Sequence, residues 1–270
     1  MPFAQSSGVR LYYEDSGAGP AVLFVHELAS DLRQWRGTIA ALRPRYRCIA
    51  WNARGYPPSD TPDAPEAYRW EAFAGDIGAV LDHLELPGAI LVGWSMGGYA
   101  ALQFARLRPE RVLGLVLAGV GSGSPAAERG PFQAQMLELA QAWRTDPAAA
   151  AELVAASPGR QPLKRDPRAF AAWLADLKTH SPQGMALTCA NYQALRPSLE
   201  ACEADLARLS PPVLLMVGEA DAPCLEASRW LARTIPGAQL TVLEGGGHAP
   251  MLEDPAGFAR ALEQFLAGLG

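Results

Sequence analysis

One short stretch near the middle of the chain constrains the fold more than any other. Residues 89–92 are Ala-Ile-Leu-Val, typical of a buried strand, and residues 99–102 are Tyr-Ala-Ala-Leu, typical of a helix. Residues 93–97 between them read Gly-Trp-Ser-Met-Gly, so we expect Ser95 on a sharp strand-to-helix turn. A side chain in place of either glycine would crowd the turning backbone. The N–H groups that open the helix would point toward an anion formed beside Ser95.

The rest of the chain alternates between similar apolar runs and helical patterns. Buried strands are indicated at residues 21–26, 112–118 and 213–218, and an edge strand with alternating polarity at residues 9–14. This rhythm predicts an α/β fold with a mostly parallel sheet that is covered by helices on both faces.

Residues 122–210 interrupt this rhythm. They contain helical segments separated by proline and glycine, with no strand pattern between them. We therefore expect a helical cap at residues 122–210, inserted into a core formed by residues 1–121 and 211–270.

Composition excludes several classes of function. The 270-residue chain has a formal net charge of −5 and no basic cluster larger than Lys164-Arg165, so nucleic acid is not an expected partner. The absence of a signal-like N-terminus and of a long apolar run favours a cytoplasmic protein without membrane contact.

Cys224 is expected to be inert, because no nearby sequence signal would lower its pKa. Free, buried thiols without metal-ligand spacing are expected for Cys48, Cys189, Cys202 and Cys224, and no metal or organic cofactor is implied.

Ser95 needs a base to act as a nucleophile, because a serine hydroxyl is almost entirely protonated near neutral pH. Two later strand ends supply the missing groups: Asp221 follows the strand at 213–218, and His248 follows a strand at 239–243. Parallel strands place their C-terminal ends at one edge of the sheet, so the three residues can converge there. Two structural alternatives stay open: Asp221 also suits a helix cap, and His248 also suits a surface loop.

These residues resemble the motifs of the α/β-hydrolase family. Residues 93–98 are similar to its nucleophile elbow, residues 218–221 to its acid turn, and His248 with residues 253–255 to its histidine loop. The resemblance implies an eight-stranded, mostly parallel sheet with a helical cap after the sixth strand. It also implies the serine-nucleophile branch, with its esterases, carbon–carbon hydrolases and lactonases, because the dehalogenase and epoxide hydrolase branches use an aspartate nucleophile.

The chain departs from the family pattern at two positions. Glu27 follows His26 where the family commonly has His-Gly, and Pro57 replaces a glycine of the family's loop after the next strand. The resemblance implies that the backbone N–H groups of Leu28 and Met96 form the oxyanion hole. His26 itself is expected to hydrogen-bond the loop backbone.

Several residues near these motifs admit two interpretations. Glu27 is either a solvated or arginine-paired loop carboxylate, or a carboxylate at the pocket mouth that contacts substrate or water. Trp94, Trp143 and Trp173 are either core side chains or walls of a substrate pocket. His180 is expected on the surface of the cap.

The leading interpretation is hydrolysis of a small carboxylic ester or related acyl compound through an acyl-enzyme on Ser95. His248 would move the proton, and Asp221 would orient the imidazole. A carbon–carbon bond hydrolase or a lactonase would use the same three residues. A ligand-sensing protein that keeps them but turns over slowly is the alternative from a different class. The expected partner is a small-molecule substrate, and a homo-oligomer stays open.

Overall fold

The structure is a computed structural model that describes residues 2–269. Eight strands form one sheet in the order β1-β2-β4-β3-β5-β6-β7-β8. They are β1 (Phe3–Ser6), β2 (Val9–Ser16), β3 (Ala21–Val25), β4 (Arg47–Trp51), β5 (Ala89–Trp94), β6 (Val112–Ala118), β7 (Val213–Gly218) and β8 (Gln239–Leu243). Strands β3 to β8 run in one direction, while β2 is antiparallel to both β4 and β1. The predicted α/β fold with a mostly parallel sheet is confirmed.

The expectation that residues 9–14 form the edge strand is wrong. Strand β1 pairs with β2 on its outer side, so β2 is the second strand of the sheet. The missed strand has only four residues, Phe-Ala-Gln-Ser, which is too short for an alternating pattern to be recognised in the sequence.

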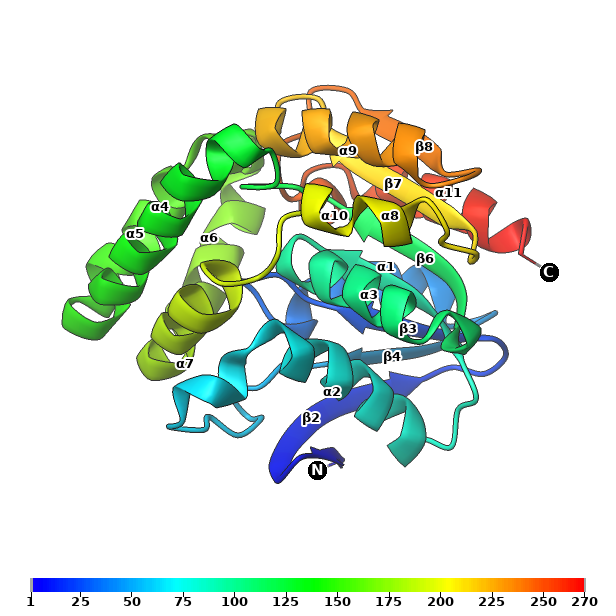
Figure 1. The fold of residues 1–270 in the computed structure, drawn as a ribbon, viewed down its shortest axis with the longest axis horizontal. Coiled ribbons are helices and arrows are strands. Elements are labelled where there is room, and N and C mark those ends of the chain that lie inside the picture. The colour runs from blue at the N-terminus through cyan, green and yellow to red at the C-terminus, as the bar shows by residue number, and fades with distance from the viewer. Residues whose placement is uncertain (1, 270) are drawn as a thin grey trace.

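Helices cover both faces of the sheet. Those of the core are α1 (Arg36–Leu42), α2 (Trp70–His83), α3 (Met96–Leu107), α9 (Ala222–Thr234), α10 (Pro250–Glu253) and α11 (Pro255–Ala267). Helices α2, α3 and α9 lie in front of the sheet in Figure 1, and α1 and α11 lie behind it. Residues at the N-terminus of a helix determine where it begins. In α11, proline occupies the first turn, and the Asp254 carboxylate accepts a hydrogen bond from the Gly257 N–H at 2.9 Å.

The chain between β6 and β7 is helical. It forms α4 (Ala126–Thr145), α5 (Pro147–Ala156), α6 (Pro167–Leu177), α7 (Pro182–Leu187) and α8 (Glu203–Leu206), and a π-helical turn, η6 (Thr188–Gln193). The same segment contains the short 3₁₀ helices η4 (Pro158–Arg160), η5 (Pro162–Arg165) and η7 (Glu200–Cys202). Three more 3₁₀ helices precede β6: η1 (Leu32–Trp35), η2 (Pro65–Tyr68) and η3 (Pro109–Arg111). Helices α4 to α7 lie together on the left in Figure 1, to one side of the sheet.

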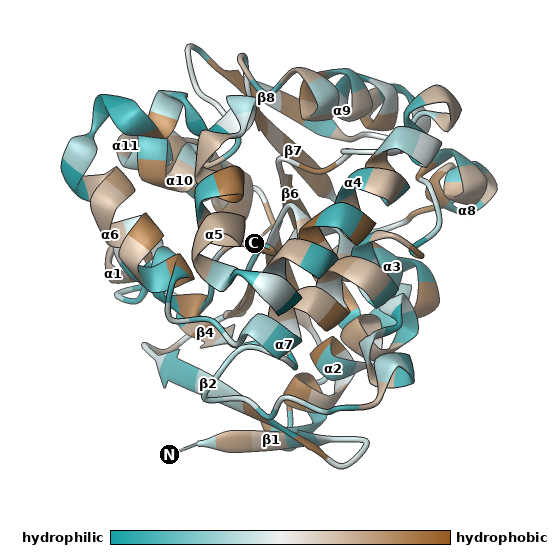
Figure 2. Cartoon of the chain, turned by 90° about the vertical axis from the view of Figure 1, so that its left-hand side faces the viewer, coloured by the Kyte–Doolittle hydropathy of each residue, from teal (hydrophilic) through white to brown (hydrophobic). Residues whose placement is uncertain are grey.

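Apolar residues are concentrated in the central strands of the sheet, and the helices that cover it are amphipathic. Every residue of β3, β5 and β7 is buried, as their unbroken apolar runs predict for strands covered on both faces. In Figure 2 the central strands are brown, while the outer helices carry both teal and brown surfaces. Within residues 2–269, no helix combines the length and apolar character needed to cross a lipid bilayer.

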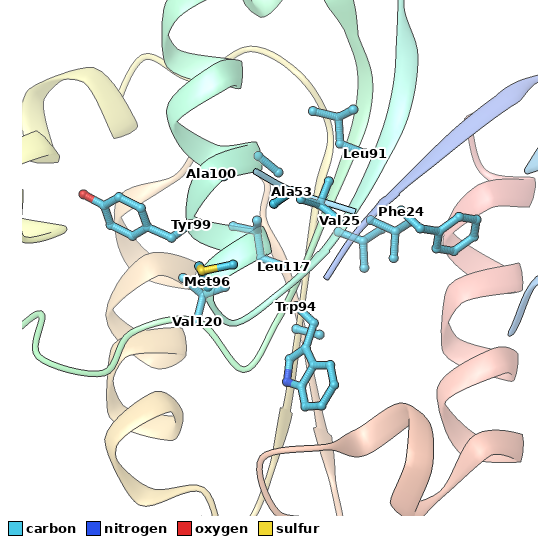
Figure 3. Close-up of a cluster of buried hydrophobic side chains, with 14 of the residues drawn as sticks. Phe24, Val25, Ala53, Leu91, Trp94, Met96, Tyr99, Ala100, Leu117 and Val120 are labelled. Carbon is cyan, nitrogen blue, oxygen red and sulfur yellow. The ribbon is translucent and has the colours of Figure 1, made fainter. Parts of the chain in front are cut away.

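The turn between β5 and α3 is tightly packed. Ser95 has φ 49° and ψ −112°, a backbone conformation that residues other than glycine rarely adopt. A Cβ on Gly93 would lie 2.5 Å from the Gly98 Cα, and one on Gly97 would overlap the carbonyl oxygens at the end of β3. The surrounding apolar cluster (Figure 3) includes Phe24, Val25, Leu91, Trp94, Met96, Tyr99, Leu117 and Val120. The turn is therefore held by its neighbours on both sides.

We predict that Gly97→Ala destabilises the protein, because the added methyl overlaps the carbonyl oxygens of Val25 and His26. The free energy of unfolding should fall by about 1–3 kcal/mol, measured by urea denaturation. Gly75→Ala is the matched control. Gly75 lies exposed within α2 with open space around its Cβ position, so alanine there should stabilise by about 0.5–1 kcal/mol. Equal effects of the two substitutions would contradict this account of the turn.

Candidate active site

The C-terminal ends of three parallel strands bring Ser95, Asp221 and His248 together. Ser95 follows β5, Asp221 follows β7, and His248 lies in the loop after β8. The Ser95 Oγ is 2.9 Å from His248 Nε2, and His248 Nδ1 is 2.7 Å from Asp221 Oδ2. Residues 153 positions apart in sequence thus form one hydrogen-bonded chain.

The neighbours of the imidazole fix its tautomer. The Asp221 carboxylate accepts only, so His248 Nδ1 donates to it and Nε2 is left to accept from the Ser95 hydroxyl. Burial opposes a charged His248, but the charge and hydrogen bond of Asp221 outweigh it and raise the pKa of His248 well above 6.5. Burial likewise opposes a charged Asp221, yet its pKa is lowered because His248 is beside it. The pair therefore favours proton uptake by the imidazole.

Asp221 occupies the N-cap position of α9, but its side chain makes no capping hydrogen bond. It contacts His248 instead, so the structure does not bear out the capping alternative.

Cys224, in the first turn of α9, has its Sγ 3.8 Å from His248 Nδ1. Burial and the Asp221 charge raise the pKa of this thiol, so it stays protonated even beside the histidine. All four cysteines are free and buried, as predicted.

The loop that carries His248 is braced on both sides. The Glu253 carboxylate accepts hydrogen bonds from the N–H groups of Gly247 and Ala249, at 3.0 Å for Ala249. The His248 N–H donates to the Gly159 carbonyl at 2.9 Å, and the Trp94 indole N–H donates to the His248 carbonyl. The alternative of a free surface loop does not describe this residue, whose side chain is 15% exposed.

The two expected oxyanion donors belong to oriented peptide groups. The peptide that carries the Leu28 N–H has the Glu27 carbonyl, which accepts from His26 Nδ1 at 2.7 Å. The peptide that carries the Met96 N–H has the Ser95 carbonyl, which accepts from the Tyr99 N–H at 2.9 Å. Within residues 2–269, neither the Leu28 N–H nor the Met96 N–H donates to a protein acceptor. Both are thus available to an anion beside Ser95.

His26 makes both of its bonds as a neutral ring. Its Nδ1–H donates to the Glu27 carbonyl, and its Nε2 accepts from the Ala53 N–H at 2.9 Å. Complete burial lowers its pKa to about 4. The expected backbone contact of His26 is therefore present, and it sets the orientation of the Leu28 N–H.

Glu27 is paired with an arginine and also faces the site. Its Oε1 forms a buried ion pair with Arg160 of η4, and its Oε2 lies 3.8 Å from His248 Nε2. The Arg160 guanidinium lies over the rings of Trp94 and Trp173, at 5.1 and 4.8 Å from their centroids. The arginine-paired interpretation of Glu27 thus describes its contacts, while its carboxylate still lines the cavity beside Ser95.

A cavity of about 840 Å³ opens beside the triad, between the sheet edge and the helices after β6. Glu27, Leu28, Ser95, Asp221 and His248 line it, together with residues of α4, α5 and η4. Its volume suits a small organic molecule.

None of the three tryptophans is among the residues that line this cavity. Trp94 and Trp173 lie behind it, stacked on Arg160, and Trp143 lines a separate hollow beside Asp63 and Pro182. Their core interpretation fits these positions, because each side chain is at most 4% exposed.

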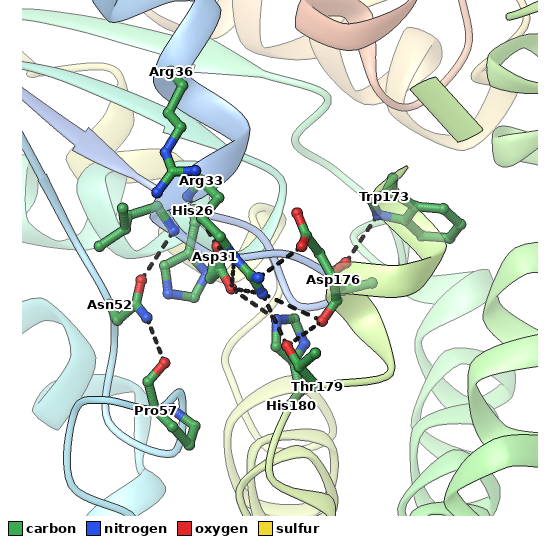
Figure 4. A network of polar contacts seen from close by, with 12 residues as sticks. His26, Asp31, Arg33, Arg36, Asn52, Pro57, Trp173, Asp176, Thr179 and His180 are labelled. Atoms are coloured by element: carbon green, nitrogen blue, oxygen red, sulfur yellow. Dashed lines mark hydrogen bonds and ion pairs between the residues drawn. The ribbon is translucent and has the colours of Figure 1, made fainter. Parts of the chain in front are cut away.

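A polar network joins the loop after β3 to the helices after β6 (Figure 4). Arg33 forms ion pairs of 2.6 Å with both Asp31 and Asp176, and His180 lies 3.3 Å from Asp31. The Trp173 indole N–H donates to the Ala29 carbonyl at 2.9 Å. The expectation that His180 lies on the surface is wrong: it is 5% exposed, because it is enclosed where the two parts of the chain meet.

The structure offers one group of side chains with the spacing of a metal site among residues 2–269. Potential ligand atoms of Asp221, Cys224 and His248 lie within 4.8 Å of one another. A metal bound to His248 Nδ1 would replace the hydrogen bond to Asp221 and leave the ring proton on Nε2, which could then no longer accept from the Ser95 hydroxyl. This geometry opposes a resident metal at the triad.

Comparison with known proteins places the chain in a family. A sequence model of the alpha/beta hydrolase fold matches residues 20–255. The chain belongs to the α/β-hydrolase fold family. It is 31% identical over 247 residues to 3-oxoadipate enol-lactonase 2 of Acinetobacter baylyi, covering 90% of this chain and 87% of that protein.

Solved structures of other α/β-hydrolases are similar over nearly the whole chain. A thermophilic esterase from Thermogutta terrifontis has a TM-score of 0.88 and 27% identity, covering 99% of this chain and 98% of the other. The enol-lactonase from Burkholderia xenovorans LB400 shares the fold, with a TM-score of 0.85 and 24% identity over 98% of this chain and 100% of the other.

Two site residues of this α/β-hydrolase, Arg160 and Arg196, escaped the sequence analysis. Both line the cavity, and each is at most 5% exposed. They lie in the helical insertion, outside the motifs by which the family is recognised. An excess of basic residues there could have indicated them, but acidic residues nearby in sequence hide any such excess.

We predict that His26 makes the stability of this α/β-hydrolase depend on pH between about 4 and 6.5. Its pKa is about 4 in the folded chain, against 6.5 for an ordinary histidine, so the unfolded chain binds the proton more readily in this range. The free energy of unfolding should therefore fall by about 3 kcal/mol as the pH falls from 6.5 to 4.

Denaturant unfolding of the wild type and of His26→Gln across this range tests the prediction. Glutamine keeps one donor and one acceptor but does not titrate, so this part of the pH dependence should vanish in the variant. The same pH slope in both proteins would contradict the assignment.

Proposed function

We propose that the chain is a serine hydrolase that cleaves a small carboxylic ester or lactone through an acyl-enzyme on Ser95. The observation that carries the proposal is the hydrogen-bonded chain from the Ser95 Oγ through His248 to Asp221, at 2.9 and 2.7 Å. A serine is weak as a free alcohol and becomes reactive when an adjacent base accepts its proton.

The chemistry then follows from the positions of the groups. Ser95 Oγ attacks the acyl carbon while its proton moves to His248 Nε2. The imidazolium gives that proton to the leaving oxygen, and Asp221 stabilises the charge and keeps the tautomer. Water attacks the acyl-enzyme with His248 again as base, which releases the acid and restores the hydroxyl. In a lactone, the leaving hydroxyl stays attached to the released acid.

The oxyanion formed on the acyl group would be held by the N–H groups of Leu28 and Met96. Each such donor typically contributes about 3 kcal/mol of transition-state stabilisation. Glu27, which replaces the family's glycine, does not prevent this arrangement: its side chain is directed to Arg160, and its carbonyl accepts from His26.

Several features bear on the choice of substrate. The enol-lactonase of Acinetobacter baylyi and the esterase of Thermogutta terrifontis support ester or lactone cleavage. A carbon–carbon hydrolase would use the same three residues, but no contact in this cavity favours it. We further propose that residues 122–210 act as a cap over the bound substrate, because α4, α5 and η4 contribute to the cavity wall.

We predict that a fluorophosphonate probe labels the purified protein at Ser95 and abolishes its hydrolysis of short-chain esters and lactones. Ser95→Ala should not be labelled, and its kcat/KM should fall on the order of 10⁴-fold or more. Ser210→Ala is the matched control, because Ser210 is an exposed serine that precedes β7, at the opposite edge of the sheet. It should be labelled and active like the wild type.

Absence of labelling in the wild type would contradict the proposal and favour the ligand-sensing alternative. A panel of short and long acyl esters, lactones and dienoate diketones distinguishes the bond types. Turnover of the diketones alone would favour the carbon–carbon hydrolase.

A further inference from the structure

The cavity beside Ser95 contains two buried guanidinium groups that differ in their counter-ions. Arg160 is neutralised by Glu27. Arg196 has no carboxylate within 4.0 Å in the part of the chain that the structure describes. The cavity thus holds one cation without a partner of opposite charge.

Hydrogen bonds fix two of the three guanidinium nitrogens of Arg196, and the third has no partner among residues 2–269. It is 5% exposed, and its Nε donates to the Gln193 side chain at 2.9 Å while Nη2 donates to the Ser122 carbonyl at 2.8 Å. Its Nη1 is buried and has no hydrogen-bond partner within the described range of residues 2–269. Buried polar groups are ordinarily paired, so an unpaired guanidinium nitrogen points to a missing acceptor.

The guanidinium lines the same cavity as Ser95 and lies beside two aromatic rings of that cavity. It lies 4.3 Å from the centroid of the Tyr99 ring and 5.2 Å from that of Phe132. Tyr99 is one turn of α3 beyond Ser95, about 6 Å along the helix axis. Ser95, Tyr99, Phe132 and Arg196 all line the same cavity, so one small molecule can reach both the hydroxyl and the guanidinium.

The electrostatic surroundings favour an anion at Arg196. A second arginine, Arg129, donates to the Arg196 carbonyl and likewise has an unpaired, buried Nη1. Burial and the charge of Arg196 lower the pKa of Arg129. The remaining carboxylates of the cavity wall, Glu128 and Glu138, are exposed residues of α4. Among residues 2–269, neither Arg196 nor its neighbour Arg129 has a carboxylate within 4.0 Å.

We propose that Arg196 binds a carboxylate carried by the substrate, so that the natural substrate is an ester or lactone with a free carboxylate group. The proposal rests on the hydrolase function proposed above and specifies its substrate class. A planar guanidinium matches a carboxylate in shape and charge, and such charge-assisted bonds are among the stronger ones in proteins.

The test compares the 4-nitrophenyl monoester of glutaric acid with its methyl-capped, uncharged counterpart. The wild type should prefer the free carboxylate by about 10- to 100-fold in kcat/KM, as expected for hydrogen bonds to a charged group. In Arg196→Gln the ratio of the two kcat/KM values should fall to near one. The loss should be mainly in KM, because the contact lies away from the reacting atoms.

Arg144→Gln is the matched control, because Arg144 is an exposed arginine of α4 that does not line the cavity beside Ser95. It should keep most of the preference for the charged substrate. If both variants lose the preference equally, the effect belongs to the general positive field and the assignment to Arg196 is wrong.

A binding measurement separates this proposal from the hydrolase function. Titration calorimetry should show that glutarate binds the wild type and Arg144→Gln but binds Arg196→Gln at least tenfold more weakly, while glutaramide does not bind. Equal turnover of both esters by the wild type, without glutarate binding, would overturn the role of Arg196 and leave the hydrolase intact. Turnover of neither ester would contradict the hydrolase function, and the calorimetry would still decide the role of Arg196.

Discussion

The turn after β5 packs directly against the end of β3, and the geometry of the candidate active site depends on this contact. Gly97 has no side chain, so the first turn of α3 packs directly on the carbonyl oxygens of Val25 and His26, which any Cβ at this position would overlap. The loop that continues from β3 carries Leu28, and α3 begins with Met96. Two adjoining backbone segments therefore carry the N–H groups of both expected oxyanion donors. Ser95, with its unusual backbone conformation, lies between a strand and a helix that are closely packed.

The helical insertion contacts both the loop that carries His248 and the loop that carries Glu27 and Leu28. Gly159 accepts a hydrogen bond from the His248 backbone, and the adjacent Arg160 is paired with Glu27. On the other side, Arg33 joins Asp31 to Asp176. A substitution in the insertion can thus alter the histidine or the oxyanion loop without touching the substrate. Glu27, which replaces the family's glycine, takes part in this connection: its side chain pairs with Arg160 of the insertion, and its carbonyl accepts from His26.

The sequence predicted the fold and the convergence of Ser95, Asp221 and His248 because both depend on local patterns. Each of the three residues follows a strand within a few residues, and parallel strands end at one edge of the sheet. The strand β1 was missed because four residues carry too little pattern. The positions of His180, Arg160 and Arg196 could not be predicted, because the residues that their side chains contact across the fold, Asp31, Glu27 and Ser122, come from distant segments. The pairing of Arg160 with Glu27, for example, joins residues 133 positions apart.

The most direct test of the central claim is to trap the covalent intermediate. The protein is mixed with 4-nitrophenyl acetate, quenched in acid within milliseconds to seconds, and analysed by intact mass and peptide mapping. We predict a transient acetyl group on the peptide that contains Ser95, with a burst of nitrophenolate of about one equivalent per protein chain. His248→Gln should form this adduct far more slowly. If the wild-type protein hydrolyses the ester without any adduct on Ser95, or with the acetyl group on Cys224 instead, the account is contradicted.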